Sequence, residues 1–509
     1  MANKHETLTS LFSDIADALR EKIGGTDQIK ADDFPDLIRS KLQFVRPQSF
    51  LTFSSPSAFD MSVASPGWDG TIEYSTDKSN WQTWNGSSIS AVLSDGTYAL
   101  YICGTGNTHI TGEDASSRKW TLTGSNITCS GNIESLLDHA TVTNGNHPAM
   151  SDSCYRWMFY QCTSLVSAPA LPATTLTGNC YAYMFWGCTS LVSAPALPAT
   201  TLAEGCYSSM FTRCTALTSA PELPATTLAS ECYYGMFMAT GLTSAPALPA
   251  TTLADTCYRY MFSNCASLKT APQLPAMSLT QYCYDSMFVN CSELITAPEL
   301  PGTTLALSCY GNMFAGCKSL TTAPNLPAMT MADECYAAMF ASCTGLTSAP
   351  ALPATTLALK CYSNMFGGCE GLTTAPALPA TTLAQECYMN MFQRCYSLVA
   401  PPSLPATTIA TRCYMYMFKE CYDLVAVPAL PATTLATGCY YRMFYSCYKI
   451  KVATTQSNGY TRAYRIPTSG SGSTASSALQ NMFQDTGGSF QGTPNINTTY
   501  YLDTSNTIV

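Results

Sequence analysis

Residue types that enzymes use for chemistry are scarce in this sequence. Its 509 residues include four histidines, His5, His109, His139 and His147, and only 11% of the residues are charged. No nucleophile–base arrangement and no phosphate-binding glycine loop of the form G-x-x-x-x-G-K-[ST] is visible. We therefore expect a protein that is not an enzyme and that uses no cofactor.

Basic charge and long apolar runs are also lacking. The formal net charge of −9 argues against the basic face that nucleic-acid binding requires. No apolar run approaches the roughly 18 residues of a membrane-spanning helix, so no membrane insertion is expected. The first residues, Met1 to Thr7, show no apolar core of a secretory signal peptide. We expect synthesis in a cytoplasm and, if the protein works outside the cell, release by another route.

Cysteine, by contrast, is abundant, and its placement is regular. Twenty-three of the 25 cysteines fall in two columns eight residues apart, as in Cys154 and Cys162. On a helix that separation is about 12 Å, whereas a disulfide needs about 4.4–6.8 Å between Cα atoms. The spacing favours buried free thiols, and disulfides between neighbouring repeats remain the alternative. No metal site is expected, because the C-x7-C spacing is not a zinc pattern and no histidine lies among these columns.

The cysteines belong to a unit that recurs almost unchanged every 26 residues. It runs from Cys154 to Leu176 in its first copy and returns until about Cys447. Only one step is 25 residues long, because a residue is missing between Thr240 and Leu242. A fixed period of this length indicates a repeat architecture. The twelve copies begin at Cys154, Cys180, Cys206, Cys232, Cys257, Cys283, Cys309, Cys335, Cys361, Cys387, Cys413 and Cys439.

Each unit has two halves of different character. In the Cys-Tyr-x-x-Met-Phe-x-x-Cys half, apolar residues at i, i+4 and i+8 predict a short helix, preceded by capping patterns at Thr201–Glu204 and Thr252–Asp255. The Leu-x-Ser/Thr-Ala-Pro-x-Leu-Pro half predicts a short strand and a polyproline-like turn, because its prolines lack backbone donors. One helix and one strand per unit predict an α/β repeat fold, a leucine-rich-repeat solenoid of twelve repeats.

The Met-Phe-x-x-Cys-x-Ser-Leu core resembles the BspA-like leucine-rich repeats of bacterial and phage surface proteins. The resemblance covers about 300 residues, and it implies a solenoid over residues 150–452.

The flanking segments differ from the repeats. Residues 1–45 predict a helical segment, with an apolar stripe at Leu8, Leu11, Ile15 and Leu19. The stretch 8–38 resembles the N-terminal segment of tail-associated proteins of bacteriophages and prophages, which implies docking to a virion tail. Residues 46–149 alternate short apolar segments with Gly, Asn, Asp and Ser, which predicts a β-rich, sandwich-like domain. Residues 453–509 predict a C-terminal cap with a degenerate repeat.

Candidate binding residues lie where the copies differ from one another. Those positions are aromatic at both ends of the array and mostly small in copies three and six to nine, and Tyr and Arg are favoured contact residues. The alternative is that the rings shield the ends of the array against the flanking domains, which we favour for the first two copies. A second candidate surface is the Thr/Ser-rich strand face, for example Thr243 and Ser244. The C-terminal candidates are Tyr396, Tyr416, Tyr422, Tyr441, Tyr445, Tyr448 and Arg442, and the N-terminal candidates are Trp157, Tyr160, Tyr183 and Trp186.

Together these features predict a phage tail fibre or tail-tip adhesin. It would be made in the host cytoplasm, reside in the virion tail, and bind a host-surface polysaccharide or protein. The N-terminal segment would contact other virion tail proteins, and we expect a homo-oligomer that binds through several weak contacts. The alternatives are a purely structural virion component, such as a decoration or stabilising protein, and a bacterial surface adhesin.

Overall fold

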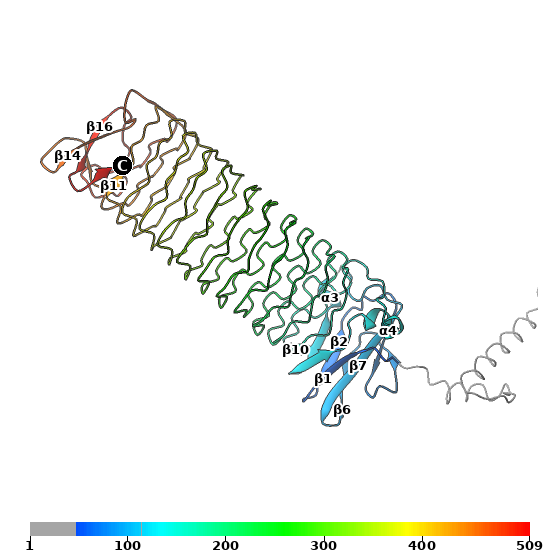
Figure 1. Cartoon of the computed structure of the whole chain (residues 1–509). Coiled ribbons are helices and arrows are strands. Elements are labelled where there is room, and N and C mark those ends of the chain that lie inside the picture. The colour runs from blue at the N-terminus through cyan, green and yellow to red at the C-terminus, as the bar shows by residue number, and fades with distance from the viewer. Residues whose placement is uncertain (1–46, 113–114) are drawn as a thin grey trace, which may run out of the picture.

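The structure is a computed structural model that describes residues 47–112 and 115–509. A β-rich region lies at one end of a long stack of coils, and a small group of strands lies at the other end (Figure 1). The helices expected within residues 1–45 fall outside the described residues. We number the 26-residue units as coils 1 to 12, in the order of their first cysteines.

Two β-sheets form the β-rich region. The larger sheet has the order β10-β9-β1-β7-β3-β4, with β6 also paired to β7, and the smaller has the order β5-β2-β8. Phe53 of the larger sheet and Trp120 of the smaller lie with ring centroids 6.2 Å apart, and Trp84 meets Trp120 edge to face at 5.3 Å. All three rings are buried, so they form the core between the sheets. The strands here are β1 (Leu51–Ser55), β2 (Asp60–Val63), β3 (Thr71–Ser75), β4 (Gln82–Thr83), β5 (Ile89–Ser90), β6 (Val92–Ser94), β7 (Thr97–Thr105), β8 (Trp120–Thr123), β9 (Ile127–Ser130) and β10 (Leu165–Ser167).

Two short helices accompany these sheets, α3 (Ala115–Arg118) and α4 (Ser135–Thr143). Helix α4 packs on β7. A side chain at Gly104 of β7 would collide with the backbone carbonyl of Leu136, so the glycine permits this close approach.

The β-rich region supplies the layer of chain that hydrogen-bonds to coil 1 from outside the array; we call such a flanking layer a rung. Strand β9 pairs antiparallel with β1 on one side and parallel with β10 of coil 1 on the other. The backbone N–H of Trp120 donates to the Met158 carbonyl at 2.7 Å, and the Cys162 thiol donates to the Trp120 carbonyl at 3.1 Å. The apolar end of the first coil is therefore covered by hydrogen-bonded backbone rather than by a flexible linker.

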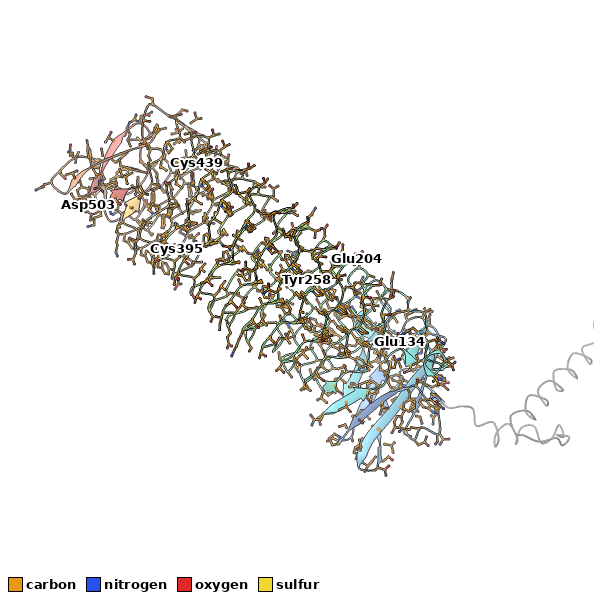
Figure 2. The ribbon with its side chains drawn as sticks, viewed as in Figure 1. Glu134, Glu204, Tyr258, Cys395, Cys439 and Asp503 are labelled. Carbon is orange, nitrogen blue, oxygen red and sulfur yellow. The ribbon has the colours of Figure 1, made fainter. Side chains whose placement is uncertain are left out.

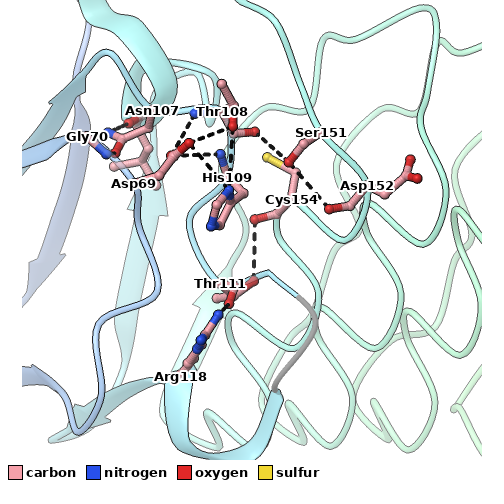
Figure 3. Close-up of polar contacts among 11 residues, drawn as sticks. Asp69, Gly70, Asn107, Thr108, His109, Thr111, Arg118, Ser151, Asp152 and Cys154 are labelled. Carbon is pink, nitrogen blue, oxygen red and sulfur yellow. Dashed lines mark hydrogen bonds and ion pairs between the residues drawn. The ribbon is translucent and has the colours of Figure 1, made fainter.

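A polar cluster fixes the same junction (Figure 3). Asp69 accepts hydrogen bonds from the backbone N–H and the hydroxyl of Thr108 at 2.8 and 2.7 Å. Burial raises the pKa of Asp69, but the hydrogen bonds from Thr108 and His109 outweigh it and hold the pKa below its usual value. The Thr111 hydroxyl donates to the Cys154 carbonyl, and the Arg118 guanidinium donates to the Thr111 carbonyl at 2.9 Å. The loop before α3 is thereby tied to the first cysteine of the array.

The predicted helix in each unit is wrong. Throughout residues 154–453, all of which the structure describes, the Cys-to-Cys segments are successions of turns and no α-helix is present. In coil 2, alternate N–H groups donate three residues back, as Met184 does to the Tyr181 carbonyl. The intervening N–H groups donate to the next coil, as Phe185 does to the Met210 carbonyl at 3.0 Å. Half of the backbone N–H groups therefore donate to the next coil, whereas in a helix they would donate within the same segment.

Left-handed residues at every fourth position explain this pattern. In coil 2, Asn179, Tyr183 and Gly187 have φ of 54°, 58° and 72°, and the equivalent residues of the other coils are also left-handed. A residue in this conformation interrupts a right-handed helix and changes the direction of the backbone. Glycine and asparagine, which tolerate it best, recur at these positions, for example at Gly316 and Asn312.

Aromatic and sulfur columns fill the interior of the stack, and Tyr258 and Cys395, which are labelled in Figure 2, are both buried. The tyrosine after each first cysteine stacks on its equivalent one coil away, with centroid separations between 5.5 Å (Tyr155 and Tyr181) and 5.9 Å (Tyr388 and Tyr414). The phenylalanines do the same, from 5.5 Å at Phe159 and Phe185. All 25 cysteines are buried free thiols, which confirms the thiol prediction. Burial raises the pKa of thiols such as Cys162 to about 12.

The proline-containing half forms less strand than predicted. Single parallel bridges join successive coils, for example Ser244 to Thr270 and Thr227 to Thr252. The hydrogen-bonded ladder between coils does not extend beyond these bridges, because the prolines of the Ala-Pro-x-Leu-Pro segments have no backbone N–H to donate. Named strands in this half are β10 of coil 1 and the two-residue strands β11 (Ala426–Val427) and β12 (Thr434–Leu435) of coil 11.

The C-terminal residues form one further rung and a small sheet. The Phe444 N–H donates to the Met482 carbonyl at 3.0 Å, and Phe483 stacks on Phe444 at 5.6 Å, so residues 478–486 continue the stack. Strands β15 and β17 pair parallel with β12 and β11, and β13, β16 and β14 form an antiparallel sheet. These strands are β13 (Val452–Ala453), β14 (Tyr460–Arg465), β15 (Ser473–Thr474), β16 (Thr499–Asp503) and β17 (Thr507–Ile508).

Candidate functional site

Three of the predicted C-terminal tyrosines form a stacked column on the surface. Tyr396, Tyr422 and Tyr448 each follow the second cysteine of their coil, and the coil stack brings them into line. The ring centroids of Tyr396 and Tyr422 are 4.8 Å apart, and those of Tyr422 and Tyr448 are 5.2 Å apart. The rings are almost parallel, with interplanar angles of 2° and 17°.

This stacking limits what the column can offer to a ligand. Both faces of the Tyr422 ring are covered by its neighbours, so Tyr422 presents only its edge and its hydroxyl to solvent. The edge of an aromatic ring carries partial positive charge, and the hydroxyl both donates and accepts hydrogen bonds. The inner part of the column is therefore suited to hydrogen-bonding groups rather than to a ring laid flat on it.

Ion pairs form among the charged side chains beside this column. Arg394 contacts Glu420 at 2.7 Å, Lys419 contacts Glu420 at 3.1 Å, and Lys449 contacts Asp423 at 2.5 Å. Burial raises the pKa of Glu420, but its hydrogen bonds with Arg394 and Lys419 outweigh it and lower the pKa below its usual value. Arg394 and Lys419 share the single carboxylate of Glu420, so the three cations near the column are offset by two carboxylates.

The remaining C-terminal candidates form a separate cluster on the turn segments. Tyr416 and Tyr441 meet edge to face at 5.4 Å. The Arg442 guanidinium lies 5.2 Å from the ring centroids of both Tyr441 and Tyr445, and Lys419 lies over Tyr416 at 5.5 Å. Cation–π contacts of this kind stabilise the rings within the protein. The predicted set therefore divides into two groups, a stacked column and a cation–aromatic cluster.

The N-terminal candidates lie together and connect the β-rich region to the coils. Tyr160 stacks on Trp186 at 4.7 Å, Lys119 lies over the free face of Tyr160 at 5.4 Å, and Arg213 lies over Trp186 at 5.0 Å. Beside this column, Trp157 stacks on Tyr183 at 4.1 Å, and Trp157 also meets Tyr160 edge to face. Cations cover both ends of the first column, and one of them belongs to the β-rich region.

Sequence reasoning missed a continuation of this aromatic surface. Tyr234 and Tyr260 meet edge to face at 5.7 Å, and Arg259 lies over Tyr260 and Tyr282 at 5.0 and 4.8 Å. Arg259 also pairs with the buried Asp285 at 2.8 Å. The signal was present, since Tyr234 and Tyr260 occupy the two variable positions after Cys-Tyr, as Tyr183 does.

The strand side of the coils carries hydroxyl and apolar groups and little charge. The threonine pairs of the Ala-Thr-Thr segments, such as Thr226 and Thr227, are exposed. Hollows of about 340 and 240 Å³ lie between neighbouring Ala-Pro-x-Leu-Pro segments, around Pro221 and Pro246 in one case and Pro350 and Pro376 in the other. Isolated exposed apolar residues, including Val192 and Ile295, accompany them.

The described part of the chain holds neither a cluster of metal ligands nor a membrane-spanning helix. Within residues 47–112 and 115–509, no three His, Cys, Asp or Glu side chains converge as a set of metal ligands. No helix among those same residues has the length and apolar character needed to cross a bilayer.

Part of the chain matches the model of one known family. Residues 134–269 and 226–373 match the model of the BspA type leucine rich repeat region (6 copies). Residues 134–373 are therefore similar to BspA-type leucine-rich repeats. No curated protein and no solved structure matches the chain.

In the repeats the shared residues form the interior and the variable residues form the surface. Cys, Tyr, Met, Phe and Leu of each unit are buried, whereas the candidate aromatic residues are half-buried or exposed. Leucine-rich-repeat regions are typically binding or structural rather than catalytic. A binding role would therefore depend on the positions at which the copies differ.

Proposed function

We propose that the chain is a non-enzymatic phage tail fibre or tail-tip adhesin, built as a twelve-coil solenoid that presents its C-terminal tyrosines to a host receptor. The observation that carries the proposal is the location of variation. The interior columns are nearly invariant from coil to coil, while the variable positions of coils 10 to 12, farthest from the β-rich region, carry a surface column of tyrosines that ends in the exposed Tyr448.

The architecture supports this proposal in two ways. The β-rich region is joined to coil 1 by a continuous backbone ladder, so it would hold the array at a fixed direction. A long array also offers many equivalent positions, and several weak contacts can together give strong attachment. The N-terminal segment would dock the chain to other virion tail proteins, and the receptor would be a surface polysaccharide or a protein.

The alternative is a purely structural virion component. The self-stacked rings and the paired charges favour it, because groups that satisfy one another need no ligand. A bacterial surface adhesin is the third candidate, since BspA-type repeats alone do not distinguish a phage origin from a bacterial one.

The test combines particle composition with cell binding. Antibodies against the full chain should label the tails of the virions of its phage, and the purified full chain should bind cells of the host strain and compete with phage adsorption. Label on the virion without cell binding would favour the structural component. Binding to cells without any label on virions would favour the bacterial adhesin.

A further inference from the structure

The rung that follows coil 12 is one residue short at a specific place. In residues 478–486, Thr486 stands where other coils have their second cysteine, and its hydroxyl donates to the Phe483 carbonyl at 2.9 Å. Coil 4 has the same arrangement, because the Thr240 hydroxyl donates to the Phe237 carbonyl at 2.9 Å and Gly241 follows directly.

Glycine contacts identify the missing position. A Cβ on Gly487 would collide with the carbonyl of Tyr448, as a Cβ on Gly345 would collide with the carbonyl of Lys318. Gly345 is the second residue after Cys343, whereas Gly487 is the first after Thr486. Gly487 therefore occupies the second position, and the position that carries Tyr396, Tyr422 and Tyr448 in the preceding coils is absent from this rung.

The absence leaves one face of the tyrosine column open. Tyr422 covers one face of Tyr448, but the last rung has no residue at the position that would cover the other face. Tyr448 is accordingly 54% exposed, while Tyr396 and Tyr422 are half-buried. At the opposite end of the column, Glu370 occupies the equivalent position beside Tyr396. The column thus ends in a single open aromatic face.

The surroundings of that face indicate its ligand. Lys449 and Asp423 lie beside the column as an exposed ion pair, 56% and 46% exposed, so a donor and an acceptor border the ring. An aromatic side chain of a protein partner would meet this charged rim without compensating hydrogen bonds. A sugar ring has apolar C–H groups on its face and hydroxyl groups around its edge, which match an aromatic face with a polar rim.

We propose that Tyr448 is the stacking platform for one uncharged pyranose ring, which takes the place of the missing residue and becomes the fourth member of the column. This inference rests on the proposed receptor-binding function and specifies its ligand as a glycan. One ring contributes a weak contact, and attachment would depend on several copies of the chain.

The test uses saturation-transfer NMR on the full chain with a panel of methyl pyranosides of glucose, galactose, mannose, rhamnose, N-acetylglucosamine and N-acetylgalactosamine. At least one glycoside should receive saturation, strongest at the protons of one ring face. The signal should be lost in Tyr448→Ser and retained in Lys318→Ser, which changes the residue at the same position of coil 7.

A second variant fills the missing position. Insertion of a tyrosine between Thr486 and Gly487 should cover Tyr448 and abolish the signal, while insertion of a serine at the same place should reduce it less. If the insertions do not fold, Tyr448→Trp provides the complementary test, because its larger face should strengthen glycoside binding several-fold.

Three outcomes would overturn the inference. The first is no saturation transfer to any glycoside of the panel, and the second is transfer that survives Tyr448→Ser. The third is transfer only to N-acetyl-tyrosinamide, measured beside the panel as an aromatic peptide probe, which would indicate an aromatic peptide partner. The proposed function fails separately, if the wild-type chain binds no host cells although it binds a glycoside. If Tyr448→Ser leaves cell binding intact, the receptor contact lies elsewhere and only the inference fails.

Discussion

The thiol of Cys188 donates a hydrogen bond to the backbone carbonyl of Phe159, one coil earlier, with the sulfur 3.0 Å from the oxygen. The same contact recurs along the stack between the second cysteine of a coil and the preceding phenylalanine, for example between Cys317 and Phe288 at 3.1 Å. Both partners are buried. The second cysteine is therefore a packing residue that joins consecutive coils.

Removing one such thiol should destabilise the array measurably. Cys317→Ala loses the hydrogen bond to the Phe288 carbonyl and leaves a small void, so we expect the free energy of unfolding to fall by about 1–2 kcal/mol. Urea denaturation under reducing conditions measures the change. The exposed neighbour Lys318→Ala serves as the control and should change stability by less than about 0.5 kcal/mol. Equal stability of the two variants would show that the thiol contact contributes nothing.

Alkaline pH should destabilise the fold. Burial raises the pKa of Cys162, Cys343 and Cys447 to about 12, so these thiols stay protonated in the folded chain above the pH at which unfolded cysteines ionise. The folded state then binds more protons than the unfolded state, and stability falls as pH rises from about 9 to 12. Urea midpoints measured in reductant across this range should decrease steadily. A midpoint that stays constant up to pH 11 would contradict the burial of the thiols.

The left-handed positions should discriminate between residue types. Asn312 has φ of 54°, a conformation that costs a β-branched residue about 1–2 kcal/mol. Asn312→Val should therefore destabilise the chain by about that amount, whereas Asn312→Gly should be tolerated within about 0.5 kcal/mol. Thermal melting of the two variants at equal concentration provides the comparison. If valine is tolerated as well as glycine, the segment does not have the turn conformation described.

An alternating charge ladder on coils 8 to 11 should be sensitive to salt. Lys360 pairs with Glu334 at 3.4 Å and lies 3.9 Å from Glu386, which pairs in turn with Arg412 at 3.4 Å. Lys360→Glu would align three carboxylates, and we expect a loss of about 1 kcal/mol at low salt. The loss should shrink in 1 M NaCl, where exposed charges are screened. Lys360→Gln is the matched control, and an effect independent of salt would exclude the electrostatic cause.

The repeat, its period and its buried thiols could be predicted because they depend on residue spacing alone. The helix could not, because Cys, Met and Phe at helical spacing also suit a chain of turns. The choice is made by left-handed residues such as Asn179, Asn312 and Gly316, whose backbone donors bond to the next coil. Asn and Gly at fixed places between the apolar positions were the signal against a helix.

The candidate site was predictable in its membership but not in its geometry. The sequence places Tyr396, Tyr422 and Tyr448 in one column, but only the structure puts their rings face to face and pairs the neighbouring cations with Glu420 and Asp423. It also separates Tyr416, Tyr441 and Tyr445 into another cluster. Ring orientation depends on packing between coils, which a single repeat does not encode.

Adsorption by the full chain with Tyr396, Tyr422 and Tyr448 all changed to serine tests the central claim most directly. The matched control changes Lys318, Thr344 and Glu370, which hold the same position in coils 7 to 9, to serine. We predict that the tyrosine variant loses at least about tenfold in binding to host cells, equivalent to about 1.4 kcal/mol, while its melting temperature falls by no more than about 3 °C and the control binds like the wild type. Unchanged binding by the tyrosine variant, or a large loss of stability with it, would contradict a receptor-binding role for this column.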